Sequence, residues 1–342
     1  MRAVRYHGEG RLELEEIEDP RPGPEDVLLE SLAVGVCGTD THIVSGHFVS
    51  RPPVVLGHEI SARVLAVGSQ VSGDLVGRLI TVEPHLYCGR CTPCQVGQQH
   101  LCPHRRAPGV HINGGMAERL VVPATLAYPV PDGVSPEHAA MTEPIACCVH
   151  GMDRLAPQSG RPLAVFGSGP AGAIMIALAR LAGASPIVAF DPQSSRRDLA
   201  LRVGADVALD PSADNAATIR KLTDGDGFAS VIDAVGSARV VEQAIQESAR
   251  GGRILLFGVT DPAERASISP NDVYQRELSI LGTALNPYTH RRAVGLLQRL
   301  PLAELTTTAF DLEHVPDALD AQRRGLADKV FIHPQTTTGG SR

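Results

Sequence analysis

The stretch that most constrains the fold of this chain is rich in glycine and reads Gly167-Ser168-Gly169-Pro170-Ala171-Gly172. The apolar run Leu163–Phe166 leads directly into it, and an apolar helical pattern follows. A second apolar run ends at Asp191, 19 residues after the last glycine. A GxGxxG pattern is weak when it stands alone. Between a strand and a helix, and followed by an acidic residue, it predicts a dinucleotide-binding βαβ unit.

The same unit indicates which dinucleotide binds. The glycines let backbone N–H groups approach a pyrophosphate at the N-terminus of a helix. Asp191 can accept hydrogen bonds from the adenosine ribose hydroxyls and would repel a 2′-phosphate, which favours NAD over NADP. Arg196, a second candidate cofactor contact, and Arg197 weaken that preference because they follow closely and carry positive charge. The alternative for Asp191 is a turn residue that only caps the next helix.

From about residue 153 the pattern alternates between strands and helices. We expect strands at 187–190, 231–233, 252–258 and 278–282, and a helix at 241–249. Such alternation implies a parallel sheet.

The first part of the chain has a different pattern, made of short strands with frequent glycine and proline. Strands are expected at 12–15, 27–34, 54–56, 63–68 and 120–122, and a helix begins near Ser135, a plausible N-cap. A last strand at 329–332 can rejoin this part. Residues 336–342 have the composition of a disordered tail.

One segment of this first part carries metal-binding side chains at both ends. It opens with Cys37-Gly38-Thr39-Asp40-Thr41-His42 and closes with Gly57-His58-Glu59, in a chain with seven cysteines. Taken singly, a cysteine is more often a small buried residue and a histidine more often a surface residue. Together, thiolate and imidazole favour zinc, and a catalytic zinc keeps one position open. We therefore expect Cys37 and His58 to hold a catalytic zinc, with a glutamate as third ligand.

Four further cysteines lie close together, with gaps of two, two and seven residues. They are Cys88, Cys91, Cys94 and Cys102. This spacing predicts a closed four-thiolate structural zinc site. An iron–sulfur cluster is the main alternative, because Cys102-Pro103 is similar to the end of bacterial ferredoxin motifs, although the last gap there is three residues. Unliganded thiols are a third reading.

Composition excludes several classes of function. A length of 342 residues suits two domains. The net charge of −7 argues against general nucleic-acid binding, and 12 aromatic residues without tryptophan leave few stacking platforms. The N-terminus lacks the apolar run of a signal peptide, and the longest apolar helical stretch, 171–181, is too short to cross a membrane. We expect a cytoplasmic enzyme with no nucleic-acid or membrane partner.

Taken together, these motifs resemble the zinc-containing medium-chain dehydrogenase/reductase family over nearly the whole chain. Val82-Glu83-Pro84 and Glu143-Pro144 resemble its polyol (sorbitol-type) branch rather than the ethanol branch. The resemblance implies an α/β protein with a GroES-like β-rich catalytic domain, residues 1–152 completed by 287–342. It further implies a Rossmann domain over 153–286, zinc in the cleft between the domains, and a homodimer or homotetramer. Two departures, Ala62 for a usual glycine and Arg78 in a usual Gly-Asp-Arg-Val turn, do not touch the ligands.

The resemblance also implies roles for individual residues. Glu59 is a direct zinc ligand, and Glu143 binds through water or replaces it, so both stay open as the third ligand. Because adjacent side chains of a strand point to opposite faces, His58 and Glu59 can bind one ion only if the backbone turns between them.

Three residues around Cys37 are candidates for proton transfer and orientation. Thr39 takes the proton of the alcohol, His42 passes it towards water, and Asp40 orients His58. Alternatively, Thr39 and Asp40 only cap the helix around His42. Cys147 and Cys148 fall on apolar positions of the branch.

The expected reaction is reversible oxidation of a secondary alcohol of a polyol, sugar or cyclitol to a ketone, with NAD and two zinc ions per chain. One alternative is the same chemistry on an aminocyclitol or sugar intermediate of a biosynthetic pathway. A non-enzymatic alternative is an NAD-binding redox sensor with structural zinc. Candidate pocket residues are His47, Asn286 and Tyr288.

Overall fold

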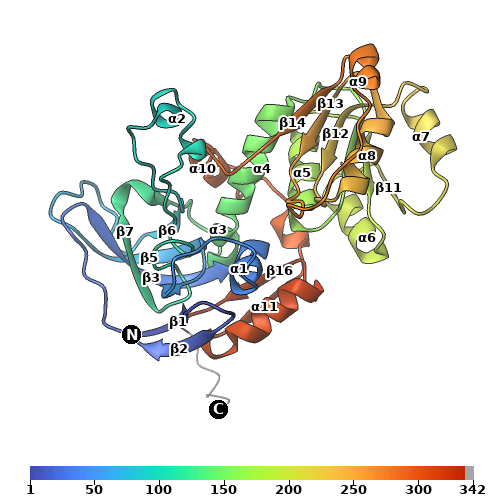
Figure 1. Ribbon diagram of the computed structural model, residues 1–342. Coiled ribbons are helices and arrows are strands. Elements are labelled where there is room, and N and C mark those ends of the chain that lie inside the picture. The colour runs from blue at the N-terminus through green and yellow to red at the C-terminus, as the bar shows by residue number, and fades with distance from the viewer. Residues whose placement is uncertain (336–342) are drawn as a thin grey trace. The chain divides into compact units, whose positions relative to one another are not determined.

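The structure is a computed structural model that describes residues 1–335. It consists of two compact units (Figure 1). Unit 1 comprises Met1–Ala146 and the chain from Pro287 onward, and unit 2 comprises Cys147–Asn286. The tail at 336–342, expected to be disordered, lies outside the described residues.

Unit 1 is built on two β-sheets. A small antiparallel sheet has the order β2-β1-β4, with β1 at Arg2–Tyr6, β2 at Leu12–Glu16 and β4 at Val54–Val55. The larger sheet has the order β15-β16-β3-β5-β6-β8, and β7 also pairs with β3. Its strands are β3 (Asp26–Gly35), β5 (Glu59–Val67), β6 (Leu79–Val82), β7 (Arg119–Pro123), β8 (Ala127–Pro129), β15 (Thr307–Phe310) and β16 (Lys329–Ile332).

The helices of unit 1 are short. They are α1 (Gly38–Val44), α2 (Thr92–Gln95), η1 (Gln99–Leu101), η2 (Ala124–Leu126), α3 (Pro136–Ala140), α10 (His290–Val294), η3 (Leu302–Glu304), η4 (Leu312–His314) and α11 (Val315–Arg324). Helix α4 (Thr142–Leu155) starts in unit 1 and continues into unit 2. As predicted, the Ser135 hydroxyl caps α3 by accepting the His138 N–H at 3.2 Å.

The central strand of the larger sheet, β3, determines where the metal-binding residues lie. It pairs with β5 on one side, which places Gly35 opposite Glu59. Near the same end, β16 pairs antiparallel with β3 through Phe331 and Gly35, which confirms the expected strand at 329–332. The end of β3, the start of β5 and the start of β16 therefore meet at one edge of unit 1.

Unit 2 contains a six-stranded parallel sheet in the order β11-β10-β9-β12-β13-β14. Counted from β9, this is the 3-2-1-4-5-6 order of a Rossmann fold, so the predicted parallel sheet is confirmed. The strands are β9 (Leu163–Phe166), β10 (Ile187–Phe190), β11 (Val207–Leu209), β12 (Phe228–Asp233), β13 (Ser248–Leu256) and β14 (Ser279–Gly282). Figure 1 shows them with the helices α5 (Pro170–Leu181), α6 (Ser194–Arg202), α7 (Ala216–Leu222), α8 (Ala238–Glu247) and α9 (Pro270–Arg276).

One helix boundary differs from the prediction. Helix α8 ends at Glu247, and Ser248 and Ala249 already belong to β13. The Ser248 backbone is extended, and its hydroxyl bonds back to the Ala244 carbonyl at 2.7 Å, which ends the helix. No helix of the described residues is long and apolar enough to cross a membrane.

Candidate active site and metal centres

Cys37 is presented by the junction between β3 and α1. Its backbone is extended, with φ −114° and ψ 158°, at the position that precedes the helix. The Cys37 backbone N–H donates to Oδ2 of Asp40 at 2.9 Å, which fixes this turn. The Thr39 hydroxyl lies 3.7 Å from the Cys37 sulfur. The local motif therefore holds a thiol and a hydroxyl side by side.

His58 and Glu59 enter the same site from a turn at Gly57. Gly57 has φ +87°, so the chain changes direction before β5 starts at Glu59. Ligand atoms of Cys37, His58 and Glu59 all lie within 4.8 Å of one another. Since both side chains reach this cluster, the geometric objection to adjacent ligands does not apply here. A thiol, an imidazole and a carboxylate match the donor set of a catalytic zinc site.

Asp40 contacts His58 as well as Cys37. Oδ1 of Asp40 lies 3.5 Å from Nδ1 of His58, and the Asp40 side chain is fully buried. Burial lowers the pKa of His58, but the charge and hydrogen bonding of Asp40, aided by Cys37, outweigh burial and bring it well above the ordinary value. Asp40 therefore combines the two roles that the sequence left as alternatives: it closes the helix start and faces the histidine.

Lys329 is a member of this site that sequence reasoning missed. Its ammonium nitrogen lies 2.5 Å from Oε2 of Glu59, and the side chains are only 7% and 1% exposed. Burial lowers the pKa of Lys329, but Glu59, Cys37 and Glu143 outweigh burial and raise it above the ordinary value. The only available signal was a lysine at the start of the apolar strand Lys329–Ile332, since a buried lysine needs a partner.

Glu143, the other candidate third ligand, lies at the start of α4 and is 7% exposed. Among the described residues it does not belong to the group whose ligand atoms lie within 4.8 Å of one another. Its charge nevertheless acts on neighbouring groups. Burial raises the pKa of Glu83, the Tyr128 hydrogen bond at 3.0 Å opposes this, and Glu143 adds to the increase. Glu143 is thus buried, and its charge raises the pKa of both Glu83 and Lys329.

Other predicted residues of unit 1 lie in varied environments. His42 is exposed on α1, one turn after Thr39, and its ring centroid lies 6.4 Å from that of His47, also exposed. Tyr288 is exposed, which leaves it free to contact a ligand. In unit 2, Asn286 and Cys148 are fully buried and Cys147 is half-buried. Among the described residues, the buried amide oxygen and nitrogen of Asn286 have no hydrogen-bond partner.

A second metal-binding group lies in the loop that carries α2 and η1. Ligand atoms of Cys88, Cys91, Cys94 and Cys102 all lie within 4.8 Å of one another. The sulfurs of Cys91 and Cys94 are 3.4 Å apart, too far for a disulfide of ~2.05 Å. The backbone N–H groups of Arg90 and Cys91 lower the pKa of Cys88 to about 6. Four convergent thiols without an open side fit a structural zinc ion.

The glycine-rich loop of unit 2 connects β9 to α5. A Cβ on Gly172 would overlap the Gly167 carbonyl oxygen, so this position needs glycine for the helix to approach the strand. At Gly169 the nearest atom to such a Cβ is an Arg196 nitrogen at 4.0 Å, which leaves open space above the loop. Pro170 and Ala171 form the first turn of α5. This arrangement fits a pyrophosphate at the helix N-terminus.

Asp191 directly follows β10, and its carboxylate contacts the glycine-rich loop. It is 1% exposed, and its two carboxylate oxygens accept the Ser168 and Gln193 N–H groups, each at 2.9 Å. A carboxylate has about four acceptor positions, and these two N–H groups occupy two of them. Asp191 therefore also braces the glycine loop, a role that the sequence pattern did not indicate.

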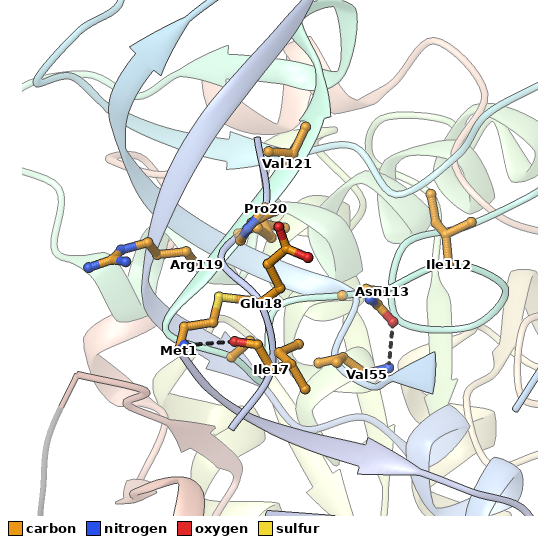
Figure 2. Close-up of a pocket in the computed structure, with 12 residues that line it drawn as sticks. Met1, Ile17, Glu18, Pro20, Val55, Ile112, Asn113, Arg119 and Val121 are labelled. Atoms are coloured by element: carbon orange, nitrogen blue, oxygen red, sulfur yellow. Dashed lines mark hydrogen bonds between the residues drawn. The ribbon is translucent and has the colours of Figure 1, made fainter. Parts of the chain in front are cut away.

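A separate hollow of about 200 Å³ lies beside the small sheet of unit 1 (Figure 2). Met1, Ile17, Val55 and Asn113 contribute to its wall, and Val55 N–H donates to Asn113 Oδ1 at 3.1 Å. The residues that line it do not include any predicted site residue. We therefore assign no role in the reaction to this hollow.

Comparisons with known proteins agree with this geometry. The family model for the alcohol dehydrogenase GroES-like domain matches residues 23–132, and the model for zinc-binding dehydrogenases matches 170–299. L-threonine 3-dehydrogenase of Pyrococcus horikoshii is 36% identical over 332 residues, 94% of each chain. D-arabinitol dehydrogenase 1 of Uromyces fabae is 30% identical and covers 98% of this chain and 97% of its own.

A solved structure supports the same family assignment. The crystal structure of a zinc-binding dehydrogenase of Sinorhizobium meliloti 1021 bound to NADP superposes with a TM-score of 0.93 at 36% identity, covering 97% of this chain and 99% of that chain. The chain belongs to the zinc-containing medium-chain dehydrogenase/reductase family. It is a zinc-dependent alcohol dehydrogenase, an oxidoreductase that acts on CH–OH groups, with a GroES-like domain and a Rossmann domain. The non-enzymatic redox sensor considered from the sequence is therefore not supported.

Proposed function

We propose that this enzyme catalyses the reversible, NAD-linked oxidation of a secondary alcohol of a polyol, sugar or cyclitol to a ketone. The observation that supports this most directly is the meeting of Cys37, His58 and Glu59 within 4.8 Å. Asp40 contacts both the Cys37 backbone and the His58 ring, which fixes the positions of these two candidate ligands.

Cys37, His58 and Glu59 would hold the catalytic zinc, and the four clustered cysteines a structural one. We assign Glu59 rather than Glu143 as the direct ligand, because its carboxylate belongs to the convergent group. Glu143, buried nearby, would act through a water molecule. When bound, zinc supplies a Lewis acid that makes an alcohol hydroxyl more acidic.

Thr39 and His42 would handle the proton. Thr39 has its hydroxyl next to the Cys37 sulfur, so it is placed to accept a proton from an alcohol at that position. His42 lies three residues further along α1, on the same side of the helix, and is exposed. An exposed imidazole exchanges protons readily with water near neutral pH.

The loop Gly167–Gly172 would bind the cofactor, which accepts the hydride. Asp191 supports a preference for NAD, because a buried carboxylate repels a 2′-phosphate. Arg196 lies beside Gly169 and would moderate that preference. The related protein bound to NADP shows why both cofactors need testing.

The relatives favour a second substrate class. L-threonine 3-dehydrogenase matches over 94% of both chains, and D-arabinitol dehydrogenase matches at similar coverage. L-Threonine and arabinitol share a secondary hydroxyl group, which is the group that this chemistry requires. A β-hydroxy amino acid is therefore the second candidate, and an aminocyclitol or sugar intermediate of biosynthesis is a variant of the first.

A substrate panel tests the proposal. Reduction of NAD⁺ and NADP⁺ is followed at 340 nm with arabinitol, sorbitol, myo-inositol and L-threonine. The proposal predicts the highest kcat/KM for a polyol or cyclitol with NAD⁺. Exclusive turnover of L-threonine would establish the second candidate instead. Light scattering of the same preparation checks the predicted homodimer or homotetramer.

A further inference from the structure

Lys329 occupies a position that an apolar side chain would normally fill. It opens β16, and the next three residues, Val330, Phe331 and Ile332, are at most 1% exposed. Its ammonium group reaches Oε2 of Glu59 at 2.5 Å and donates to the Val36 carbonyl at 3.2 Å. A buried ion pair seldom adds stability over apolar residues of the same shape, so the fold alone does not explain this lysine.

The backbone at Gly35 leaves room for the ion pair between Lys329 and Glu59. A Cβ at Gly35 would overlap Oε2 of Glu59 and would lie 3.0 Å from Cε of Lys329. Gly35 is also the residue of β3 that pairs with Glu59 on β5 and with Phe331 on β16. The absence of a side chain on this central strand therefore creates the space in which the lysine meets the carboxylate.

The Glu59 carboxylate can thus interact with two different cations. One comes from the Lys329 ammonium, and the other from the ion that Cys37 and His58 would share with it. A carboxylate that is hydrogen-bonded to a cation donates less electron density to a metal. Without a metal, the same cation compensates a charge that burial makes costly.

We propose that Lys329 is a positioning residue that competes with the catalytic metal for the Glu59 carboxylate. It neutralises Glu59 when the site is empty and weakens the hold of Glu59 on the metal when the site is loaded. This inference rests on the proposed function, since it requires zinc at Cys37, His58 and Glu59. Competition by Lys329 would make Glu59 an exchangeable ligand, while Cys37 and His58 retain the ion.

The direction in which the affinity for zinc changes when Lys329 is removed distinguishes a competing residue from a supporting one. A supporting residue would lose metal affinity on removal, as outer-shell partners commonly do by 10–100-fold. Removing a competing cation instead leaves the site more negative, so zinc should leave more slowly. The test is zinc release from the holoenzyme to a chromophoric chelator, with the four-cysteine zinc as the internal reference.

The variants are Lys329→Gln and Lys329→Arg, each with Glu59 intact and with Glu59→Gln. We expect Lys329→Gln to slow release of the catalytic zinc by about tenfold, because a second cation no longer shares the buried Glu59 carboxylate. Lys329→Arg keeps the charge and should stay near the wild-type rate. With Glu59→Gln in place, the Lys329 change should have no effect. Unchanged or faster release in Lys329→Gln would overturn the inference.

Folding of the variants gives a second, independent readout. If Lys329→Gln folds only when zinc is supplied, the metal replaces the lysine as counter-ion of Glu59, which supports the inference. If it fails to fold even with zinc while the Glu59→Gln/Lys329→Gln double variant folds, Lys329 is needed regardless of metal and the inference is wrong. Wild-type protein with only one zinc per chain would instead contradict the proposed function.

Discussion

Asp40 faces Cys37 and His58 at once: one carboxylate oxygen accepts the Cys37 N–H at 2.9 Å and the other lies 3.5 Å from Nδ1 of His58. One buried side chain therefore sets the position of two candidate ligands. Asp40→Ala should lower the affinity of the catalytic site for zinc by 10–100-fold, the usual effect of losing an outer-shell carboxylate. Chelator competition measures this, and the four-cysteine zinc should stay bound. Equal affinity in variant and wild type would refute the orienting role.

The four-cysteine loop should lose its metal as a unit. Replacing Cys102 by Ser removes one of four convergent sulfurs and should leave one zinc per chain instead of two. Because the loop then lacks the zinc ion that would link its four cysteines, we expect faster proteolysis between Cys88 and Cys102. Metal analysis and limited digestion test this. Iron in the wild-type protein, with the visible absorption of a cluster, would favour the alternative reading.

The preference between NAD and NADP should depend on two residues of unit 2. Asp191→Ala removes the charge that repels a 2′-phosphate and should shift the ratio of kcat/KM towards NADP⁺ by about tenfold or more. Arg196→Ala should shift it in the opposite direction. Since Asp191 also accepts the Ser168 N–H, its loss should raise the KM for both cofactors. Unchanged ratios in both variants would show that other residues select the cofactor.

Acid sensitivity should arise from His290, a buried histidine of unit 1. Burial lowers its pKa to about 3, whereas an unfolded histidine has a pKa of about 6.5. The unfolded chain therefore binds a proton between these values and the folded protein does not. Stability is complete above pH ~6.5 and falls by about 1.4 kcal/mol per pH unit as the pH decreases towards 3. Urea unfolding at pH 7 and 5 should show this loss reduced in His290→Asn; identical losses would exclude His290 as the cause.

The features that could be predicted from the sequence are local ones. The glycine loop, its flanking strand and Asp191 lie within one βαβ unit, so their spacing alone indicated that unit. The alternation of strands and helices after it indicated the parallel sheet that the structure shows. Likewise, gaps of two residues between thiols indicate proximity without knowledge of the fold. The end of α8 was misplaced because Ser248, whose hydroxyl closes the helix, has no distinctive pattern around it.

The features that could not be predicted depend on distant pairing. Lys329 contacts the carbonyl of Val36, 293 residues earlier in the chain, and only the pairing of β16 with β3 brings them together. The double role of Asp40 depends on the approach of His58, which comes from a different segment of the chain. The choice between Glu59 and Glu143 likewise rested on which carboxylate lies beside Cys37 and His58, which residue types do not determine.

Cys37→Ser tests the proposed catalytic zinc site most directly, because it removes one of the three convergent ligands. Zinc content, NAD⁺ affinity and turnover are measured on the same preparation. We expect a fall from two zinc ions to one per chain and loss of turnover. The affinity for NAD⁺ should stay nearly unchanged, because the glycine loop belongs to the other unit. Two retained zinc ions with full turnover would contradict the proposed site.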